Sequence, residues 1–276
     1  MSYKRILTIQ DISCVGQCSL TVALPILSAC GLETSVLPSA VLSTHTAGFT
    51  GFTVRDLTDD IPGIEAHWQK EGITFDAIYT GYLGSTKQID YVAHIFDTCT
   101  GDSCIKVVDP AMADNGNLYP AFDMEYVEAM ATLCAKADYI VPNITEAYFL
   151  TGIPFKAEYD RNYIDSLLNA LSKLHCKNII LTGVSYEDGQ TGVVVYENNA
   201  YSYYPHKKEP NSCHGTGDIY ASAFVGAVVN GKTAYDAAKI AADYTVSCIQ
   251  YTATLDNHWY GAAFEPVLPK LIEALR

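Results

Sequence analysis

Residues 211–218 have the sequence NSCHGTGD and run directly into IYASAFVGAVV, the small and apolar segment 219–229. Two glycines one residue apart, then an acid and an apolar run, predict a tight loop that enters the first turn of a buried helix. Because Gly215 and Gly217 lack a Cβ, backbone N–H groups can approach a ligand closely. The helix adds unpaired N–H donors and the positive end of its dipole. This stretch therefore predicts an anion site suited to a phosphate group.

The acid after the second glycine, Asp218, lies in the first turn of the predicted helix. A helix amino terminus stabilises a charged carboxylate by about 0.3–1 kcal/mol, so we expect Asp218 to be ionised at neutral pH. It could then accept a proton from an attacking hydroxyl, a contribution of about 10²–10⁴ in rate. The N–H groups of Gly215, Thr216 and Gly217 would stabilise a phosphoryl group in transit. The alternative is that Asp218 only stabilises the helix.

The overall charge limits the class of partner. The chain has 276 residues, with 17 Lys and Arg against 31 Asp and Glu and a formal net charge of −14. Nucleic acids and anionic membranes need clustered Lys and Arg, so this balance argues against both. A phosphorylated ligand must then be held by backbone donors, a few local cations and a metal. No apolar run reaches the roughly 18 residues that a membrane span needs.

The nine cysteines are scattered, odd in number and without a Cys-x-x-Cys pair. This pattern fits neither a disulfide framework nor a zinc site. We expect reduced, mostly buried thiols in a cytoplasmic protein. The first residues enter a strand-like run without the apolar region of a signal peptide, which agrees with that expectation.

Predicted strands and helices alternate through most of the chain. Expected strands cover residues 6–9, 34–43, 75–79, 105–108, 139–141 and 178–181. Expected helices cover residues 19–30, 61–70, 86–98, 124–137, 143–152 and 162–174, then one helix from 219 and a final long helix from 233. Residues 192–196 and 200–204 alternate like an antiparallel hairpin. This pattern predicts one domain, residues 1–276, with an α/β fold: three α/β/α layers, a mostly parallel central sheet with helices on both faces, and an antiparallel edge hairpin.

Polar residues follow the predicted strands at their carboxyl ends, where ligands collect in open parallel sheets. They are Asp11, His45, Thr46, Tyr82, Asp109, Asn143, Glu146 and Thr182. Although these residues lie far apart in the sequence, the topology can bring them to one edge of the sheet. The sequence therefore predicts that they share this edge with the anion loop at 215–218.

Asn143 and Glu146 stand three residues apart at a strand-to-helix junction. Phosphoryl transfer from a nucleotide needs Mg²⁺, which takes one or two carboxylates, often through water. Glu146 and Asp109 are the candidate magnesium ligands. The alternative is that Asn143 is a helix N-cap and Glu146 a first-turn residue with a structural role only.

Three further features leave alternatives open. His45 either contacts a substrate or is a hydrogen-bonded structural histidine. Cys213 and His214 suggest a nucleophilic pair, but adjacent side chains seldom face each other, which favours loop packing. Lys207 and Lys208 either steer a nucleotide toward an acidic protein or form a solvated pair.

These motifs together resemble the ribokinase-like superfamily and, within it, the pyridoxal (vitamin B6) kinases. The superfamily resemblance is carried by GTGD at 215–218, NITE at 143–146 and DP at 109–110. The resemblance to pyridoxal kinases is carried by IQ at 9–10, STHT at 43–46 and TGYLG at 80–84. Each motif alone is weak, but the combination in this order is specific and covers nearly the whole chain.

The resemblance implies an ATP-dependent kinase that phosphorylates the 5′-hydroxymethyl group of a B6 vitamer. Asp218 would be the general base, and the amides of Gly215–Gly217 would form the anion hole. Asn143, Glu146, Asp109 and Thr182 would serve ATP and Mg²⁺, while Asp11, His45, Thr46 and Tyr82 would line the pyridine pocket. Residues 111–120 would cover the nucleotide. The resemblance further implies a monovalent cation such as K⁺ and a homodimer.

One position departs from the resemblance. Many pyridoxal kinases have Ser directly after the Ile-Gln pair, whereas this chain has Asp11. A carboxylate there would favour a protonated ring nitrogen or the amine of pyridoxamine. We therefore expect a preference for pyridoxamine or another cationic ring.

Other functions remain open from the sequence. A hydroxymethylpyrimidine kinase of thiamine synthesis also phosphorylates a primary alcohol on a nitrogen heterocycle. A sugar or nucleoside kinase is disfavoured, because the first third of the chain lacks the extra lid strands and glycine pairs usual there. From other classes, the same scaffold supports a nucleotide-dependent NAD(P)HX dehydratase or a vitamin carrier without catalysis. Asp218 beside an intact anion loop argues against a carrier.

Overall fold

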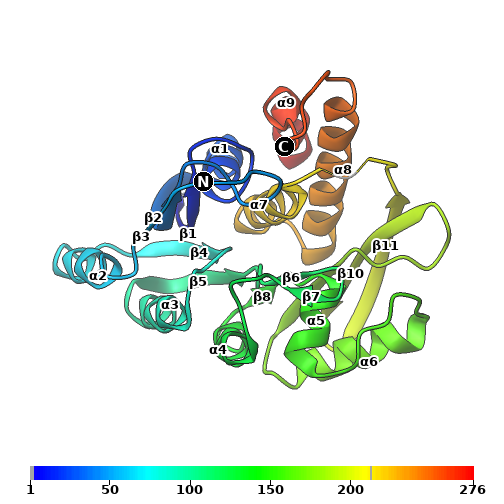
Figure 1. The fold of residues 1–276 in the computed structure, drawn as a ribbon. Helices are drawn as coiled ribbons and strands as arrows, with labels where there is room; N and C mark the ends of the chain where they lie inside the picture. The colour runs from blue at the N-terminus through cyan, green and yellow to red at the C-terminus, as the bar shows by residue number, and fades with distance from the viewer. Residues whose placement is uncertain (1–2, 212) are drawn as a thin grey trace.

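The computed structural model describes residues 3–211 and 213–276, so Ser212 of the anion-loop stretch lies outside the described residues. In this part of the chain a central sheet has the strand order β11-β10-β9-β8-β5-β4-β1-β2-β3 (Figure 1). The parallel strands are β1 (Arg5–Ser13), β2 (Glu33–Leu42), β4 (Phe75–Thr80), β5 (Thr100–Val108), β8 (Tyr139–Ile140) and β9 (Asn178–Thr182). The antiparallel strands are β3 (Val54–Asp56), β10 (Gln190–Glu197) and β11 (Ala200–Lys207).

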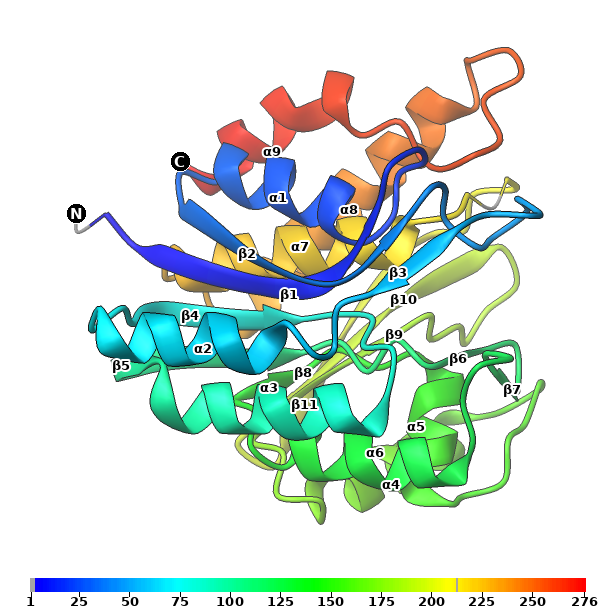
Figure 2. The ribbon, with the colours of Figure 1, turned by 60° about the vertical axis from the view of Figure 1, so that its left-hand side comes forward.

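Helices cover both faces of the sheet (Figure 2). One layer holds α2 (Ile61–Lys70), α3 (Thr86–Thr98), α4 (Met124–Cys134), α5 (Ile144–Thr151) and α6 (Arg161–Ser172). The other holds α1 (Leu20–Ala29), α7 (Thr216–Val229), α8 (Ala234–Thr252), the short 3₁₀ turn η1 (Glu265–Val267) and α9 (Leu268–Leu275). The expected three-layer α/β/α architecture with an antiparallel edge hairpin is confirmed.

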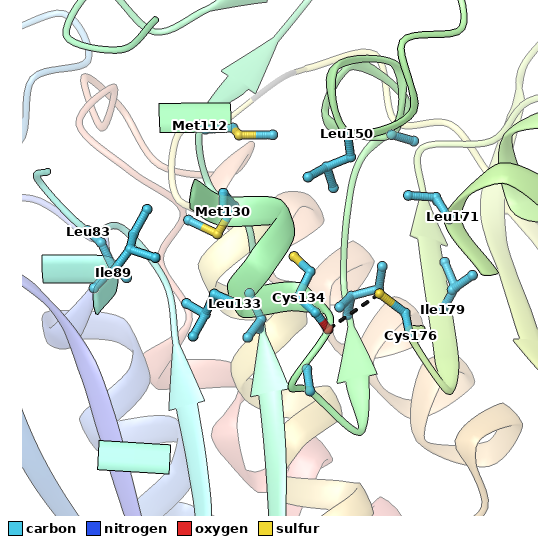
Figure 3. Packing of buried hydrophobic residues seen from close by; sticks show 14 of the residues in the cluster. Leu83, Ile89, Met112, Met130, Leu133, Cys134, Leu150, Leu171, Cys176 and Ile179 are labelled. Atoms are coloured by element: carbon cyan, nitrogen blue, oxygen red, sulfur yellow. Dashed lines mark hydrogen bonds between the residues drawn. The ribbon is translucent and has the colours of Figure 1, made fainter. Parts of the chain in front are cut away.

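Two separate cores form because successive strand residues face opposite layers. In β1, Leu7 and Ile9 pack in the core of the α2–α6 layer, whereas Ile6 packs with α1, α7 and α8. Figure 3 shows part of the first core, to which Met130 and Cys134 of α4 and Leu150 of α5 belong. With both faces of the sheet buried, the central strands consist mainly of apolar residues.

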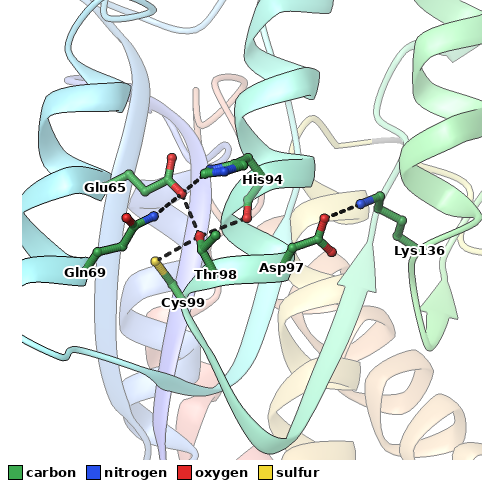
Figure 4. Close-up of polar contacts among 7 residues, drawn as sticks. All are labelled: Glu65, Gln69, His94, Asp97, Thr98, Cys99 and Lys136. Atoms are coloured by element: carbon green, nitrogen blue, oxygen red, sulfur yellow. Dashed lines mark hydrogen bonds and ion pairs between the residues drawn. The ribbon is translucent and has the colours of Figure 1, made fainter.

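A polar cluster joins α2 to α3 in the same layer (Figure 4). Glu65 of α2 is buried, and its Oε1 accepts hydrogen bonds from Gln69 Nε2, His94 Nδ1 and Thr98 Oγ1 at 3.0, 2.6 and 2.6 Å. A buried carboxylate is tolerated only when such donors replace its water. These bonds therefore fix α2 against α3.

The sequence predicted most elements within a few residues and missed others. The bounds of α2 and α3 agree with the prediction. The expectation that the helix from 233 is the last one is wrong, since α9 follows it. β3 was not predicted because its three residues are all exposed and show no apolar alternation. α7 begins at Thr216, three residues earlier than expected, so Asp218 does lie in its first turn.

No helix formed by residues 3–211 or 213–276 combines the length and apolarity required to cross a bilayer. All nine cysteines lie in the described part of the chain, and each has a free thiol.

Candidate active site

The carboxyl ends of the parallel strands bring the expected site residues to one edge of the sheet. Asp11 lies near the end of β1, Asp109 directly follows β5, and Thr182 ends β9. Asn143 is the N-cap of α5 and Gly215 that of α7. A β-bridge joins Asn143 to Thr182, and Thr182 Oγ1 donates to Pro142 O at 3.3 Å. The prediction that distant sequence motifs meet at this edge agrees with the geometry.

The two glycines of the anion loop serve different purposes. Gly215 has φ +76°, and a Cβ there would lie 1.9 Å from Gln17 O, so only glycine fits. A Cβ at Gly217 would meet nothing within 4 Å. Gly215 thus lets the loop pack against the segment after β1, and Gly217 leaves space above the first turn of α7, where a phosphate could approach the helix amino terminus.

Asp218 differs from the expectation in its ionisation. Burial, together with the charges of the nearby Asp109 and Asp11, raises the pKa of its carboxyl to about 7 against a lowering by the N–H of Ser19. The prediction of a fully ionised Asp218 at neutral pH is therefore wrong, because loss of water outweighs the helix dipole. A base with a pKa near the working pH is well suited to proton transfer.

Asp109 and Glu146 form a buried acidic pair. Glu146 completes a capping box: its Oε2 accepts from Asn143 N at 2.8 Å, and its N–H donates to Asn143 Oδ1 at 2.9 Å. Glu146 Oε1 accepts from Met112 N at 3.1 Å, and Asp109 Oδ1 accepts from Ala111 N at 3.2 Å. Asn143 is therefore the N-cap of α5 and Glu146 a first-turn residue, as the structural alternative predicted.

The electrostatics of this pair fit a cation. Burial, together with the charge of Glu146, raises the pKa of Asp109 to about 8, and burial raises that of Glu146 to about 7. A divalent cation would remove the repulsion between the two carboxylates. Within residues 3–211 and 213–276 no cluster of three or more His, Cys, Asp or Glu side chains could hold a metal alone. Phosphate oxygens and water would have to complete the shell, as Mg²⁺ prefers.

A cavity of about 550 Å³ includes Asn143, the capping partner of Glu146, and Thr182 in its wall. Lys156 and Lys208 also line it, together with the acids Asp114, Glu158, Glu187 and Asp188. Lys208 was one of the two lysines that the sequence suggested for nucleotide steering. The cavity has the size to hold a nucleotide, and its surplus of acids means that a bound phosphate would need a metal cation as well as the two lysines.

The loop expected to act as a flap contains a small hairpin, β6 (Ala113–Asp114) with β7 (Asn117–Leu118). It is held on the amino end of α5, since Asn143 Nδ2 donates to Ala113 O at 2.9 Å and Gly116 N donates to Thr145 Oγ1 at 3.0 Å. Asp114 and Asn115 line the cavity. The loop therefore forms part of the cavity wall.

Asp11, which also lies near Asp218, is one of the residues expected to bind the vitamin. Asp11 is buried, and Ser13 Oγ donates to its Oδ2 at 3.2 Å; burial raises its pKa. Burial and the charge of Asp11 raise the pKa of Tyr82. Thr46 is exposed. Asp11 and Tyr82 thus lie close enough to interact with each other.

His45 is buried and uses both ring nitrogens in contacts with the backbone, to Tyr260 O and Ala47 N. These contacts agree with the alternative in which His45 is a hydrogen-bonded structural histidine. Cys213 packs against the core beside α7, and burial raises the pKa of its thiol. A raised thiol pKa disfavours the reactive thiolate, in agreement with loop packing.

Sequence reasoning missed two aromatic residues near the site. Tyr119 lies close enough to Glu146, Asp109 and Asp218 for their charges to add to burial in raising its pKa. Phe122 lies 5.4 Å from the ring of Tyr82, centroid to centroid. Tyr119 belongs to the segment 111–120, which was recognised only as a long loop, and Phe122 follows that segment. No local pattern showed which side chains would turn toward the acids.

A mostly parallel sheet, a glycine loop that leads into α7 and buried acids at one sheet edge are the features of a ribokinase-like kinase. The sequence model of the phosphomethylpyrimidine kinase family matches residues 31–263, and the chain belongs to that family. It is similar to a putative phosphomethylpyrimidine kinase from Bacteroides thetaiotaomicron, solved with pyridoxal, with 37% identity, a TM-score of 0.92 and coverage of 98% of this chain and 96% of that chain.

Two pyridoxal kinases are also similar. The structure from Lactobacillus plantarum is 30% identical, with a TM-score of 0.91, and the match covers 99% of this chain and 98% of that one. The protein from Dictyostelium discoideum is 29% identical over 80% of this chain and 77% of its own length. The resemblance to pyridoxal kinases of the ribokinase-like superfamily is therefore confirmed.

Proposed function

We propose that the protein transfers the terminal phosphoryl group of ATP to the 5′-hydroxymethyl group of a B6 vitamer. The observation that carries this proposal is the position of Asp218. Its pKa is raised by burial and by the charges of Asp109 and Asp11, so Asp218 lies near both acids. This position at the start of α7 suits a base that would serve a phosphate donor near Asp109 and a heterocycle near Asp11.

In the proposed reaction, Asp218 takes the proton of the hydroxymethyl group while the hydroxymethyl oxygen attacks the γ-phosphorus of ATP. The new O–P bond forms as the bond to the β-phosphate oxygen breaks, and ADP leaves with the electron pair. The N–H groups of the 215–217 loop stabilise the charge of the transferred group. Asp109 and Glu146 would hold Mg²⁺, which would neutralise phosphate charge when bound.

Asp11 supports a preference within the vitamers. A buried carboxylate next to the proposed ring site is best stabilised by a cation, because its own burial disfavours the charged form. Pyridoxamine carries an amine, and a protonated pyridine nitrogen also carries a positive charge. We therefore propose that cationic substrates bind better than neutral ones.

The second candidate is phosphorylation of hydroxymethylpyrimidine. It is favoured by the family match itself and by a hydroxymethylpyrimidine/phosphomethylpyrimidine kinase of Bacillus subtilis that is 26% identical over 78% of this chain. Both reactions use a primary alcohol on a nitrogen heterocycle, so Asp218 and the anion loop suit either. Only the residues around the heterocycle can discriminate between a B6 vitamer and hydroxymethylpyrimidine.

The test is ATP consumption with purified protein and a panel of pyridoxal, pyridoxamine, pyridoxine, hydroxymethylpyrimidine and ribose. We expect turnover of at least one B6 vitamer with kcat/KM at least tenfold above that for hydroxymethylpyrimidine. Activity confined to hydroxymethylpyrimidine or to ribose would refute the substrate assignment. Vitamin binding without ATP consumption would instead indicate a carrier.

A further inference from the structure

His45 lies in the loop after β2, with only 4% of its surface exposed. Its Nδ1 accepts a hydrogen bond from the backbone N–H of Ala47 at 3.1 Å. A neutral ring with an acceptor at Nδ1 carries its proton on Nε2. Nε2 therefore donates to the carbonyl oxygen of Tyr260, 2.9 Å away. The two backbone partners fix both the tautomer and the orientation of the ring.

The segment around Tyr260 bonds to two more loops at the same edge of the sheet. Tyr260 O also accepts from Gln17 N, in the loop after β1, at 3.3 Å. Ala262 N donates to His214 O, next to the anion loop, at 3.1 Å. In Figure 2 the orange and red segment between α8 and α9 passes beside the blue loop between β1 and α1. Residues 258–262, here called the C-terminal strap, therefore hold three loops that are far apart in the sequence.

Glycines make this junction close-packed. A Cβ at Gly16 would lie 2.1 Å from His45 Cδ2, and one at Gly261 would lie 2.7 Å from Gln17 Cβ. Gly16 and Gly261 have φ values of +105° and +140°, which other residues rarely adopt. The His45 ring, the Gln17 loop and the strap thus approach each other more closely than side chains at these positions would allow.

The two residues that follow the strap are anchored to α8. Ala263 N donates to Thr252 Oγ1 at 2.8 Å, and Tyr244 OH donates to Phe264 O at 3.1 Å. At the other end of the strap, Trp259 packs against Phe49 with ring centroids 4.6 Å apart. The strap is thus a fixed support for the three loops.

We propose that His45 is a positioning residue, and that its bond to the C-terminal strap sets the geometry around the catalytic base. The Gln17 loop is the link. Its carbonyl packs on Gly215, and Ser19, two residues on, lies close enough to the Asp218 carboxylate for its backbone N–H to lower the pKa of that acid. A shift of this loop would move both a wall of the anion hole and a donor to the base. This inference rests on the proposed role of Asp218 but not on which heterocycle is phosphorylated.

Two substitutions separate the two bonds of His45. His45→Gln places an amide N–H where Nε2 donates, and so can keep the bond to Tyr260 O. His45→Asn places an amide oxygen where Nδ1 accepts, and keeps only the bond from Ala47. We expect His45→Asn to lower kcat by about 10- to 100-fold, as a misplacement of the reacting groups would. KM for ATP and for the heterocycle should change less than about threefold, and His45→Gln should restore kcat to within about fivefold.

A second pair of variants tests the same junction without touching His45. Gly261→Ala would push the strap away from Gln17, so its kcat should fall as that of His45→Asn does. Gly31→Ala is the matched control, because Gly31 has φ +83° but open space around its Cβ position. It should lose stability without losing kcat. His67→Asn, on the exposed face of α2, controls for loss of a histidine.

Other outcomes would overturn the proposal. A rise in the KM of the heterocycle in both His45 variants at unchanged kcat would make His45 a substrate contact. Equal kcat in His45→Asn and wild type, with a lower melting temperature, would make its role structural only. The assay uses whichever heterocycle the wild type phosphorylates. If the vitamin assignment is wrong, the wild type itself will not phosphorylate a B6 vitamer. If this inference is wrong, the ratio of variant to wild-type kcat will not change as expected.

Discussion

Replacing Asp109 by Asn should stabilise the ligand-free protein at pH 8 and change it far less at pH 5. Asp109 has an ordinary pKa of 3.8 in the unfolded chain, and burial beside Glu146 raises it to about 8 in the folded one. Between these values the folded state binds more protons than the unfolded state, so stability falls as pH rises. Asn is neutral at every pH, and its side-chain oxygen can still accept from Ala111 N.

The size of the effect follows from the shift. One pKa unit corresponds to about 1.4 kcal/mol, so three units between pH 5 and pH 8 correspond to about 4 kcal/mol. Relaxation and water entry around the charge recover part of this. We expect the difference in unfolding free energy between Asp109→Asn and wild type to increase by about 2 kcal/mol from pH 5 to pH 8. In a chain of this size that is roughly 4–8 °C in melting temperature.

Urea unfolding followed by tryptophan fluorescence at both pH values measures this difference. Asp102→Asn is the control, since Asp102 belongs to the same strand, β5, but is exposed at its other end. Mg²⁺ should raise the stability of the wild type at pH 8 and have less effect on Asp109→Asn. Parallel pH profiles of Asp109→Asn and wild type would refute the reasoning about the acidic pair.

Three further predictions concern catalysis. Asp218→Asn should lower kcat by about 10²–10⁴, because the base is lost. Vitamer affinity, measured by calorimetry, should stay within about threefold of wild type. Retained turnover would exclude Asp218 as the base. Because the pKa of Asp218 is raised to about 7 and the base must be ionised, kcat/KM should fall about tenfold per pH unit below that value, and a flat profile between pH 5 and 8 would contradict this. Asp11→Ser should lower the ratio of pyridoxamine to pyridoxal turnover, measured by ATP consumption, and an unchanged ratio would show that Asp11 does not select for charge.

The sequence predicted those features that depend on local chemistry. Gly215 and Asp218 mark a loop-to-helix junction through their residue types alone, and the apolar period gave the bounds of α2 and α3. The meeting of Asp109, Asn143 and Thr182 followed from a general property of parallel sheets. These predictions needed no knowledge of which side chains pack together.

Features that depend on distant contacts could not be predicted. The pKa of Asp218 depends on its burial and on Asp109 and Asp11, each about a hundred or more positions away in the chain. The role of His45 depends on the carbonyl of Tyr260, 215 residues later. Patterns within a single element contain no information on such pairs.

The direction of the β10–β11 hairpin has a consequence for engineering. Because β10 runs antiparallel to β9, its first residues and the end of β11 reach the edge where Thr182 lies, and Thr191 and Lys208 join the cavity wall. That wall is drawn from residues 114–208, whereas the residues proposed to face the heterocycle come from positions 11–82. Chimeras that exchange these two stretches between relatives would allow the phosphate donor and the acceptor to be chosen independently.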